Sequence, residues 1–503
     1  MSPSAIARRP MVLCFVWATA LAAAGSVNAQ PKNEPKPVEY QPRPGDTDLK
    51  RKLDALKPAI RDALRGNDPE AQRAALAIVA DLPPAGAEAF SAPLADFLKL
   101  ESTNPELIAL ALRTYGKTFP EAKDIASVLD PHIQSNDIKV RRAAADATAA
   151  LVSSPTQGAR SSTNAKYFLV MAVAALPFHG SAIANPDADT RKAGLDGVKT
   201  VVRELTELYS PTRLTRDEPR ADDPKDPTAK WAPLAPVLKS LDEQLPRFVS
   251  ALNAADADSR VAAARTLEQV AALRSLLLVA KVPGEGFADP FKTGLTAVMP
   301  TLVQRAKDPV AAVRQAVVEA VEPLDESLLP KSTIVAATSD AHVFVRWSAA
   351  RTLGKLGQAN ANPKVVAPEV GGLATLLSDS DVDVRVAALT ALQKYGAAAK
   401  SATLAVLVAA SKGDVEARVM AIKTLDALGS DAPSTVPVLI QGLQESDIRL
   451  RREAAGGLVR FGPDAKPALV ELRRALESDD AELRVNAAEA ILALNRKPRL
   501  RDL

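Results

Sequence analysis

Residues that bind metals or form disulfides are scarce in this 503-residue chain. It contains one cysteine, Cys14, and three histidines, His132, His179 and His342, which are far apart in sequence. No H-x-x-x-H, H-E or C-x-x-C pairing occurs, although such spacings are typical of zinc and haem sites. We therefore expect no metal and no cofactor, and a fold stabilised by its core rather than by an internal disulfide.

Catalytic motifs and excess charge are also missing. The sequence has no G-x-S-x-G, Walker-type loop or dinucleotide fingerprint in a strand-to-helix context, because no segment alternates like a strand. The formal net charge is +3, from 63 basic and 60 acidic residues. This balance argues against a general nucleic-acid or anionic-membrane binder. We expect a protein that is not an enzyme and that binds no nucleic acid.

What the sequence does contain is a repeat. Five C-terminal segments share one pattern and align on an arginine, with spacings of 39, 33, 33 and 33 residues. The aligned arginines are Arg346, Arg385, Arg418, Arg451 and Arg484. Apolar residues recur three, seven and ten positions after each arginine, and these offsets describe one stripe of an amphipathic helix. A fixed period of this length indicates stacked copies of one structural unit.

Each unit also has helix-ending signals at fixed positions. Aspartates suited to an N-cap lie four residues before the last four arginines, at Asp381, Asp414, Asp447 and Asp480. Glycines suited to the left-handed conformation lie eleven residues after the first four arginines, at Gly357, Gly396, Gly429 and Gly462. We expect the aspartates and arginines to form a structural ladder, in which each Asp caps its helix and each Arg bridges to a carboxylate or carbonyl of the adjoining unit.

A second apolar stripe lies 12 and 8 residues before the arginines, so each unit is predicted to be two antiparallel helices joined by a short turn. The register continues toward the N-terminus at Arg314, Arg260, Arg191, Arg141, Ile108 and Gln72, giving about eleven units over residues 50–497. One unit alone leaves an apolar face exposed to water, so neighbouring units must stack. The sequence predicts an all-α fold built from these helix pairs.

The shared pattern, D-x-x-V-R-x-x-A-A-x-A-L-x-x-L-G, resembles the HEAT-repeat superfamily, in the short form of phycobilisome-lyase-type and exported bacterial HEAT proteins. The resemblance covers most of the chain. It implies a right-handed α–α superhelix, which is a HEAT or armadillo-like solenoid. It implies less about function, because such solenoids serve as scaffolds, adaptors and occasionally enzymes.

The N-terminus has the three parts of a secretory signal peptide. Arg8 and Arg9 precede an apolar run over residues 11–24, and Ser-Val-Asn-Ala follows before Gln30. We expect cleavage after Ala29 and export to the periplasm or the extracellular space. A twin-arginine signal and an uncleaved anchor are alternatives, although the apolar run is shorter than the ~20 residues that a span needs. No transmembrane span is expected after cleavage.

The segments outside the repeats are predicted from their composition. Residues 30–47 are rich in proline and form a tether to a solenoid over residues 48–497. Insertions stretch the repeat spacing near residues 153–166, 210–230 and 282–291, and residues 498–503 form a basic tail. Long loops of this kind often carry binding function, so the charged 210–230 insertion is one candidate site, and simple disorder of this insertion is the alternative.

The second helix of each unit supplies another candidate site. Positions five and nine after the arginine fall outside the apolar stripe and should line the inner surface of the solenoid. The candidate partner-binding residues there are Arg351, Lys355, Lys394, Lys423 and Arg460. We expect a non-catalytic exported scaffold that binds an unidentified protein on its concave face. A simple solvated face, a structural spacer of the cell envelope and a phycobilin-lyase-like chromophore-handling protein are the alternatives.

Overall fold

The computed structural model describes residues 46–82, 84–100, 104–118, 122–153, 162–208, 234–280, 289–357 and 362–494. The predicted signal peptide, the 210–230 insertion, the basic tail and most of the tether lie outside these residues. The chain divides into two compact units, Met1–Ala59 and Ile60–Leu503. In the first unit only residues 46–59 are described, and they belong to helix α1 (Asp46–Arg65).

The second unit consists of helix pairs, and the described residues include no strand. The second helix of each pair contains one of the eleven register positions predicted from the sequence. These helices are α2 (Pro69–Asp81), α5 (Pro105–Tyr115), α7 (Ile138–Ser153), α9 (Ala188–Leu208), α13 (Ala257–Ala280), α15 (Ala311–Val321), α17 (Val343–Leu356), α19 (Val382–Tyr395), α21 (Val415–Ala427), α23 (Ile448–Leu458) and α25 (Ala481–Leu494).

The first helices precede them in the chain. They are α4 (Ser91–Lys99), α6 (Ala122–Ile133), α8 (Ser162–Ile183), α11 (Ala235–Gln244) with α12 (Phe248–Leu252), α14 (Lys292–Arg305), α16 (Lys331–Ala337), α18 (Ala367–Leu376), α20 (Thr403–Ser411), α22 (Ala432–Leu443) and α24 (Leu469–Leu476). Short turns named α3 (Pro84–Ala87), η1 (Glu88–Phe90), η2 (Leu245–Arg247), η4 (Gly396–Ala402) and η5 (Val459–Ala468) complete the connections.

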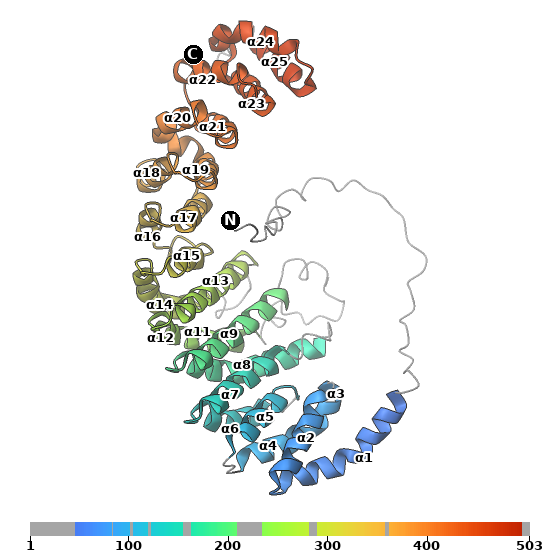
Figure 1. Ribbon diagram of the computed structural model, residues 1–503. Helices are drawn as coiled ribbons and strands as arrows, with labels where there is room; N and C mark the ends of the chain where they lie inside the picture. Colours follow the sequence, from blue (N-terminus) through green and yellow to red (C-terminus); the bar gives the residue numbers. More distant parts are fainter. Residues whose placement is uncertain are drawn as a thin grey trace, which may run out of the picture. The chain divides into compact units, whose positions relative to one another are not determined.

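The second helices stack on one another in chain order, from α2 to α25, and most first helices stack in a parallel layer (Figure 1). The core lies between the two layers. The alanines three positions after the register residue let adjacent helices approach closely. In the last five repeats they are Ala349, Ala388, Ala421, Ala454 and Ala487, all 0% exposed. The prediction of an all-α solenoid is confirmed.

Three of the four glycines have the predicted positive φ, although ψ values of −132° at Gly396 and −127° at Gly462 place these two outside the left-handed helical conformation. Gly396, Gly429 and Gly462 have φ values of 51°, 64° and 50°. Gly357 has φ −60° and ψ 119°, so it is not left-handed and the prediction is wrong there. A different constraint favours glycine at this position, because an added Cβ would lie 2.8 Å from Lys394 Cβ and 3.1 Å from Tyr395 Cδ2.

Two glycine-to-alanine substitutions should therefore change the free energy of unfolding in opposite directions. Gly371 lies inside α18, is exposed, and has no atom within 4 Å of an added Cβ. Gly371→Ala should raise the free energy of unfolding by about 0.5–1 kcal/mol, because alanine loses less backbone entropy in a helix. Gly357→Ala should lower it by about 1–3 kcal/mol through overpacking. Hydrogen exchange over α17–α19 measures both, and changes of equal sign would contradict this account.

The insertion predicted at residues 153–166 is shorter in the structure. Helix α7 ends at Ser153, but α8 already begins at Ser162, so residues 162–166 are helical rather than part of a loop. The small polar residues there suggest a loop by composition, yet serine, threonine and asparagine are also favoured at helix starts. Residues 154–161 lie outside the described ranges, as do residues 281–288 of the third interruption.

Candidate protein-interaction surface

A register arginine can contact both the turn before its own helix and the neighbouring repeat, as Arg346 shows. Arg346 Nη1 donates to the carbonyl oxygens of Asp340 and Ala341 at 2.9 and 3.1 Å, in the turn before its own helix. Its Nε and Nη2 donate to the carboxylate of Asp379, in the next repeat, at 2.5 and 2.8 Å. The hydrogen bonds from Arg346 hold the pKa of Asp379 below its ordinary value. One guanidinium thus fixes both its own turn and the neighbouring repeat.

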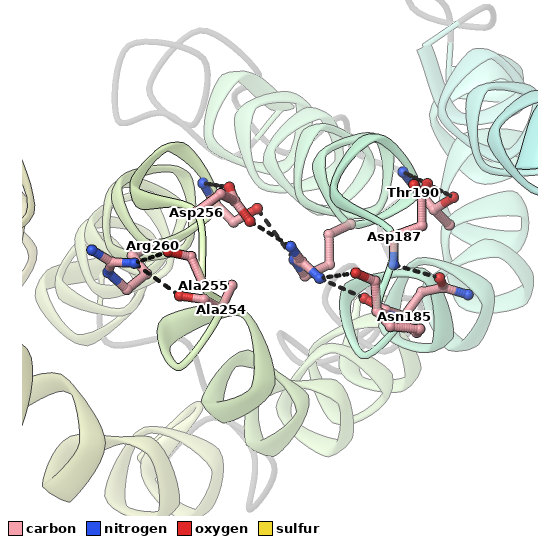
Figure 2. A network of polar contacts seen from close by, with 10 residues as sticks. Asn185, Asp187, Thr190, Ala254, Ala255, Asp256 and Arg260 are labelled. Atoms are coloured by element: carbon pink, nitrogen blue, oxygen red, sulfur yellow. Dashed lines mark hydrogen bonds and ion pairs between the residues drawn. The ribbon is translucent and has the colours of Figure 1, made fainter.

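The same arrangement occurs in the middle of the chain. Figure 2 shows Arg260 against the carbonyl oxygens of Ala254 and Ala255, each accepting at 2.8 Å. In the same turn, the Asp256 carboxylate faces the preceding repeat, where it accepts from Arg191 Nη2 at 2.5 Å (Figure 2). A single short turn therefore accepts from the arginine of its own repeat and from that of the repeat before.

Among the ladder residues predicted from the sequence, Arg385 and Arg418 have this geometry in part. Arg385 Nη1 donates to the Asp379 carbonyl oxygen at 2.6 Å, and its Nη2 contacts the Asp414 carboxylate of the next repeat. Arg418 Nη2 contacts the carboxylate of Glu445 in the next repeat at 2.6 Å. Arg418 is 8% exposed, whereas the Glu445 side chain is 30% exposed, so only the guanidinium is buried.

The expected bridge is absent at Arg451. The Nε atom of Arg451 is buried without a hydrogen-bond partner among the described residues. The adjacent Arg452 takes its place, since its Nε donates to Asp480 Oδ1 at 2.9 Å and its Nη1 contacts Glu482 Oε2 at 2.8 Å. Arg484 Nη1 donates to the Ser478 carbonyl oxygen at 2.7 Å. The last repeats therefore depart from the regular ladder.

The aspartates at the N-cap positions also differ from one another. Asp381, Asp447 and Asp480 accept capping bonds from the backbone N–H groups of their helices at 2.9, 2.9 and 2.8 Å. Asp414 makes no side-chain capping bond. Its carboxylate contacts Arg385 instead, and a guanidinium is a stronger partner than a neutral N–H group.

Except for Asp414, the acids that receive the register arginines were not identified from the sequence. Four of them lie six residues before a register arginine rather than four, at Asp308, Asp340, Asp379 and Glu445. The signal was present, because an acid recurs at this offset in four repeats. Aspartates that fit an N-cap lie only two residues later, in the same turn. The sequence alone therefore does not separate the capping acids from those that bind an arginine.

The five candidate binding residues lie on the second helices or just after them, on what we call the second-helix face. Arg351 and Lys355 on α17 both contact Glu322 of the preceding repeat, at 3.3 and 2.7 Å. The Glu322 side chain is only 9% exposed, whereas Arg351 and Lys355 are 45% and 52% exposed. One buried carboxylate therefore fixes two cations at the surface.

The remaining members are paired as well, with one exception. Lys423 contacts Glu453 of the next repeat at 3.0 Å, and Arg460 contacts Asp426 of the preceding repeat at 3.2 Å. Lys394 on α19 is exposed and has no ion-pair partner in the part of the chain that the structure describes. The structure thus brings the candidate cations onto one face and neutralises four of them with acids from neighbouring repeats.

The described residues contain no group of three or more His, Cys, Asp or Glu side chains that could hold a metal ion. No helix in these ranges combines the length and apolar character needed to cross a bilayer.

Comparisons with solved structures give only weak similarities. An engineered protein is 20% identical, with 50% of this chain and 96% of that one covered and a TM-score of 0.27. Kap95p, from a structure with RanGDP, is 14% identical over 85% of this chain and 62% of its own, with a TM-score of 0.40. Kap121p is 15% identical over 88% of this chain and 49% of its own, also at 0.40. At such TM-scores these likenesses carry no argument.

Family comparison gives a clearer result. No curated protein matches the chain in sequence. A sequence model of the family described as HEAT repeats matches residues 404–493. This match does not distinguish the phycobilisome-lyase-type form. The matched segment contains α21, α23 and α25, whose register arginine and buried alanine recur in the preceding repeats. Residues 404–493 of the chain therefore match HEAT repeats.

Proposed function

We propose that this chain is an exported, non-catalytic scaffold that binds a partner protein on the second-helix face. The supporting observation is that two arginines of this face, Arg351 and Arg460, each stack on a partly buried aromatic ring. The Arg351 guanidinium lies 4.6 Å from the ring centroid of Trp347, and that of Arg460 lies 4.4 Å from that of Phe461. Arginine and tryptophan contribute most at protein interfaces, and a stacked guanidinium is already ordered before binding.

The charges between the stacks suggest the chemistry of the partner. The cross-repeat ion pairs fix the cations on α17 and α21, and the exposed Lys394 lies on α19 between them. An acidic partner segment could contact Lys394 without displacing an existing ion pair. Ordered side chains lose less entropy on binding than mobile ones, so this face is suited to an acidic segment.

The export part of the proposal rests on residues 1–29, which lie outside the described ranges. A positively charged start, a short apolar run and a small-residue cleavage site are the physical features that the secretion machinery reads. N-terminal sequencing of the native protein should find a mature chain that begins near Gln30. An intact cytoplasmic chain would contradict export without affecting the binding proposal.

Binding is tested with variants that respect the ion pairs. Reversing all five cations would also break four of those pairs, so Lys394→Glu is the informative single change. It should weaken binding of a partner captured from the exported fraction several-fold, by about 1 kcal/mol, and most strongly at low salt.

The matched control is a double variant that carries both Lys423→Glu and Glu453→Lys. It preserves the ion pair but moves the positive charge to α23. Deleting residues 210–230 tests the alternative site in parallel. Binding that is unchanged by Lys394→Glu and independent of salt would show that the second-helix face is only solvated.

A further inference from the structure

Contacts between repeats show which positions of a second helix face the following repeat. The Leu389 carbonyl oxygen, four positions after Arg385, accepts from Thr424 Oγ1 of the next repeat at 3.2 Å. The Arg452 carbonyl oxygen lies one position after Arg451. It accepts from Asn486 Nδ2 of the next repeat at 3.1 Å. Positions one and four after the register residue therefore face forward along the stack.

Position eight faces forward as well. Gly354, eight residues after Arg346, is so close to the next repeat that an added Cβ would lie 3.0 Å from Ala391 Cβ. On the first helices of the three preceding repeats, the residue eight before the register arginine is buried. These residues are Leu377, Ala410 and Leu443, which are 5%, 2% and 7% exposed.

The last repeat presents the same positions uncovered. Leu476, the equivalent residue on α24, is 38% exposed. On α25, Val485 and Leu492 occupy positions one and eight and are 64% and 69% exposed, while Ala488 at position four is partly exposed. We call these four residues the terminal stacking face. Contiguous exposed apolar residues of this kind mark interaction sites.

The ion pair between a register arginine and an acid of the following repeat is also missing at α25, within the described residues. In most earlier repeats the register arginine receives a carboxylate from the following repeat, as Arg346 does from Asp379 and Arg418 from Glu445, although Arg451 does not. Arg484 is exposed and, within the described ranges, donates only to the Ser478 carbonyl oxygen of its own turn. The terminal stacking face therefore offers an apolar patch beside a guanidinium without a carboxylate.

We propose that the terminal stacking face is a second interaction surface, which binds a helix pair of a partner protein that places an Asp or Glu on Arg484. Most internal junctions define this complement, because they combine apolar helix packing with an acid on the register arginine, as at Arg346 and Arg418. The proposal does not depend on the second-helix face, whose residues are different.

Charge argues against two other occupants. A second copy related by a twofold axis would add the same four apolar residues and a second Arg484, so the terminal stacking face of that copy would itself supply no carboxylate. Residues 495–503 contain four basic residues and one aspartate, so they complement Arg484 poorly. A partner with an acidic turn between two helices satisfies both the apolar patch and the guanidinium.

The probe is a stapled helix-hairpin peptide with the sequence of residues 432–459. In the chain this segment forms α22 and α23, which pack on α20 and α21 and place Glu445 on Arg418 at 2.6 Å. Fluorescence anisotropy measures its binding to the full-length protein. We expect saturable binding that weakens at least about tenfold, or 1.4 kcal/mol, with Leu492→Glu. Leu404→Glu, at a 75% exposed site on α20, is the matched control and should leave binding unchanged.

A charge swap tests the ionic contact. Arg484→Glu should weaken binding of the peptide, and the Glu445→Lys peptide should restore it on that variant. Absent binding, or binding indifferent to Leu492→Glu, would overturn the proposal. Self-association in sedimentation that Leu492→Glu abolishes would assign the face to a second copy. Binding only after removal of residues 495–503 would assign it to the chain's own tail. Either result would also overturn the proposal.

Discussion

Replacing Asp308 by alanine is expected to lower the free energy of unfolding of the central repeats by about 3–5 kcal/mol. The Asp308 side chain is 0% exposed, and its Oδ1 accepts from Arg260 Nη2 at 3.0 Å and from the Val310 N–H at 3.0 Å. Burial raises the pKa of Asp308, but these hydrogen bonds outweigh it and the pKa lies below its ordinary value. Without the carboxylate, the Arg260 guanidinium would stay buried and without a countercharge.

An exposed pair of the same type is the control. Arg142 and Asp189 also connect neighbouring repeats, at 3.1 Å, but their side chains are 53% and 54% exposed. Asp189→Ala should therefore cost less than about 1 kcal/mol. Hydrogen exchange resolved by peptide is the suitable measurement, because losses in repeat arrays stay close to the altered junction. Equal losses at Asp189 and Asp308 would show that burial does not decide the strength of these ion pairs.

The fold was predictable because repetition multiplies a weak signal. A single D-x-x-V-R segment would suggest only a helix start, but five copies fix the register, the buried alanine column and the need to stack. Local geometry was less predictable. Gly357 was assigned a left-handed conformation by analogy with Gly396, whereas its constraint comes from α19, a neighbour in space.

The candidate surface was predictable in position but not in chemistry. Offsets along a helix place Lys355 and Lys394 on the same side, because helical geometry fixes the direction of each side chain. Whether a cation finds an acid depends on how far each repeat is rotated against the next. Glu322 lies one residue beyond the end of α15 and reaches both Arg351 and Lys355. No offset within one repeat reveals that contact.

The second large effect is a loss of stability that we expect when the pH is lowered. His179 on α8 is 0% exposed, and its Nδ1 lies 3.0 Å from Thr148 Oγ1 on α7. Gly197 on α9 makes room for the ring, since an added Cβ would lie 2.1 Å from His179 Cε1. The Nε2 atom has no hydrogen-bond partner among the described residues. Such a site excludes the charged imidazolium, and burial lowers the pKa of His179 from 6.5 to about 3.

The direction of the pH dependence follows from this difference. Between pH 6.5 and 3 the unfolded chain binds a proton at His179 that the folded chain does not. Stability is therefore complete above pH 6.5 and falls as the pH decreases, by up to about 1.4 kcal/mol per pH unit. Between about pH 7.5 and 4.5 we expect His179 to remove roughly 2–3 kcal/mol from the repeats that contain α7, α8 and α9.

The His179→Asn variant isolates this contribution. Asparagine can keep a hydrogen bond to Thr148 but does not titrate, so the variant should be less stable than the wild type near neutral pH. The difference should shrink by about 2–3 kcal/mol as the pH falls to about 4.5, because the carboxylates of both proteins titrate alike and only the wild type must exclude a proton at this position. Hydrogen exchange of peptides from α7 and α9 across this range measures the difference. If the stabilities of the wild type and the variant kept a constant difference across this pH range, the folded protein would accommodate a protonated His179. The packing against Gly197 would then rearrange at low pH.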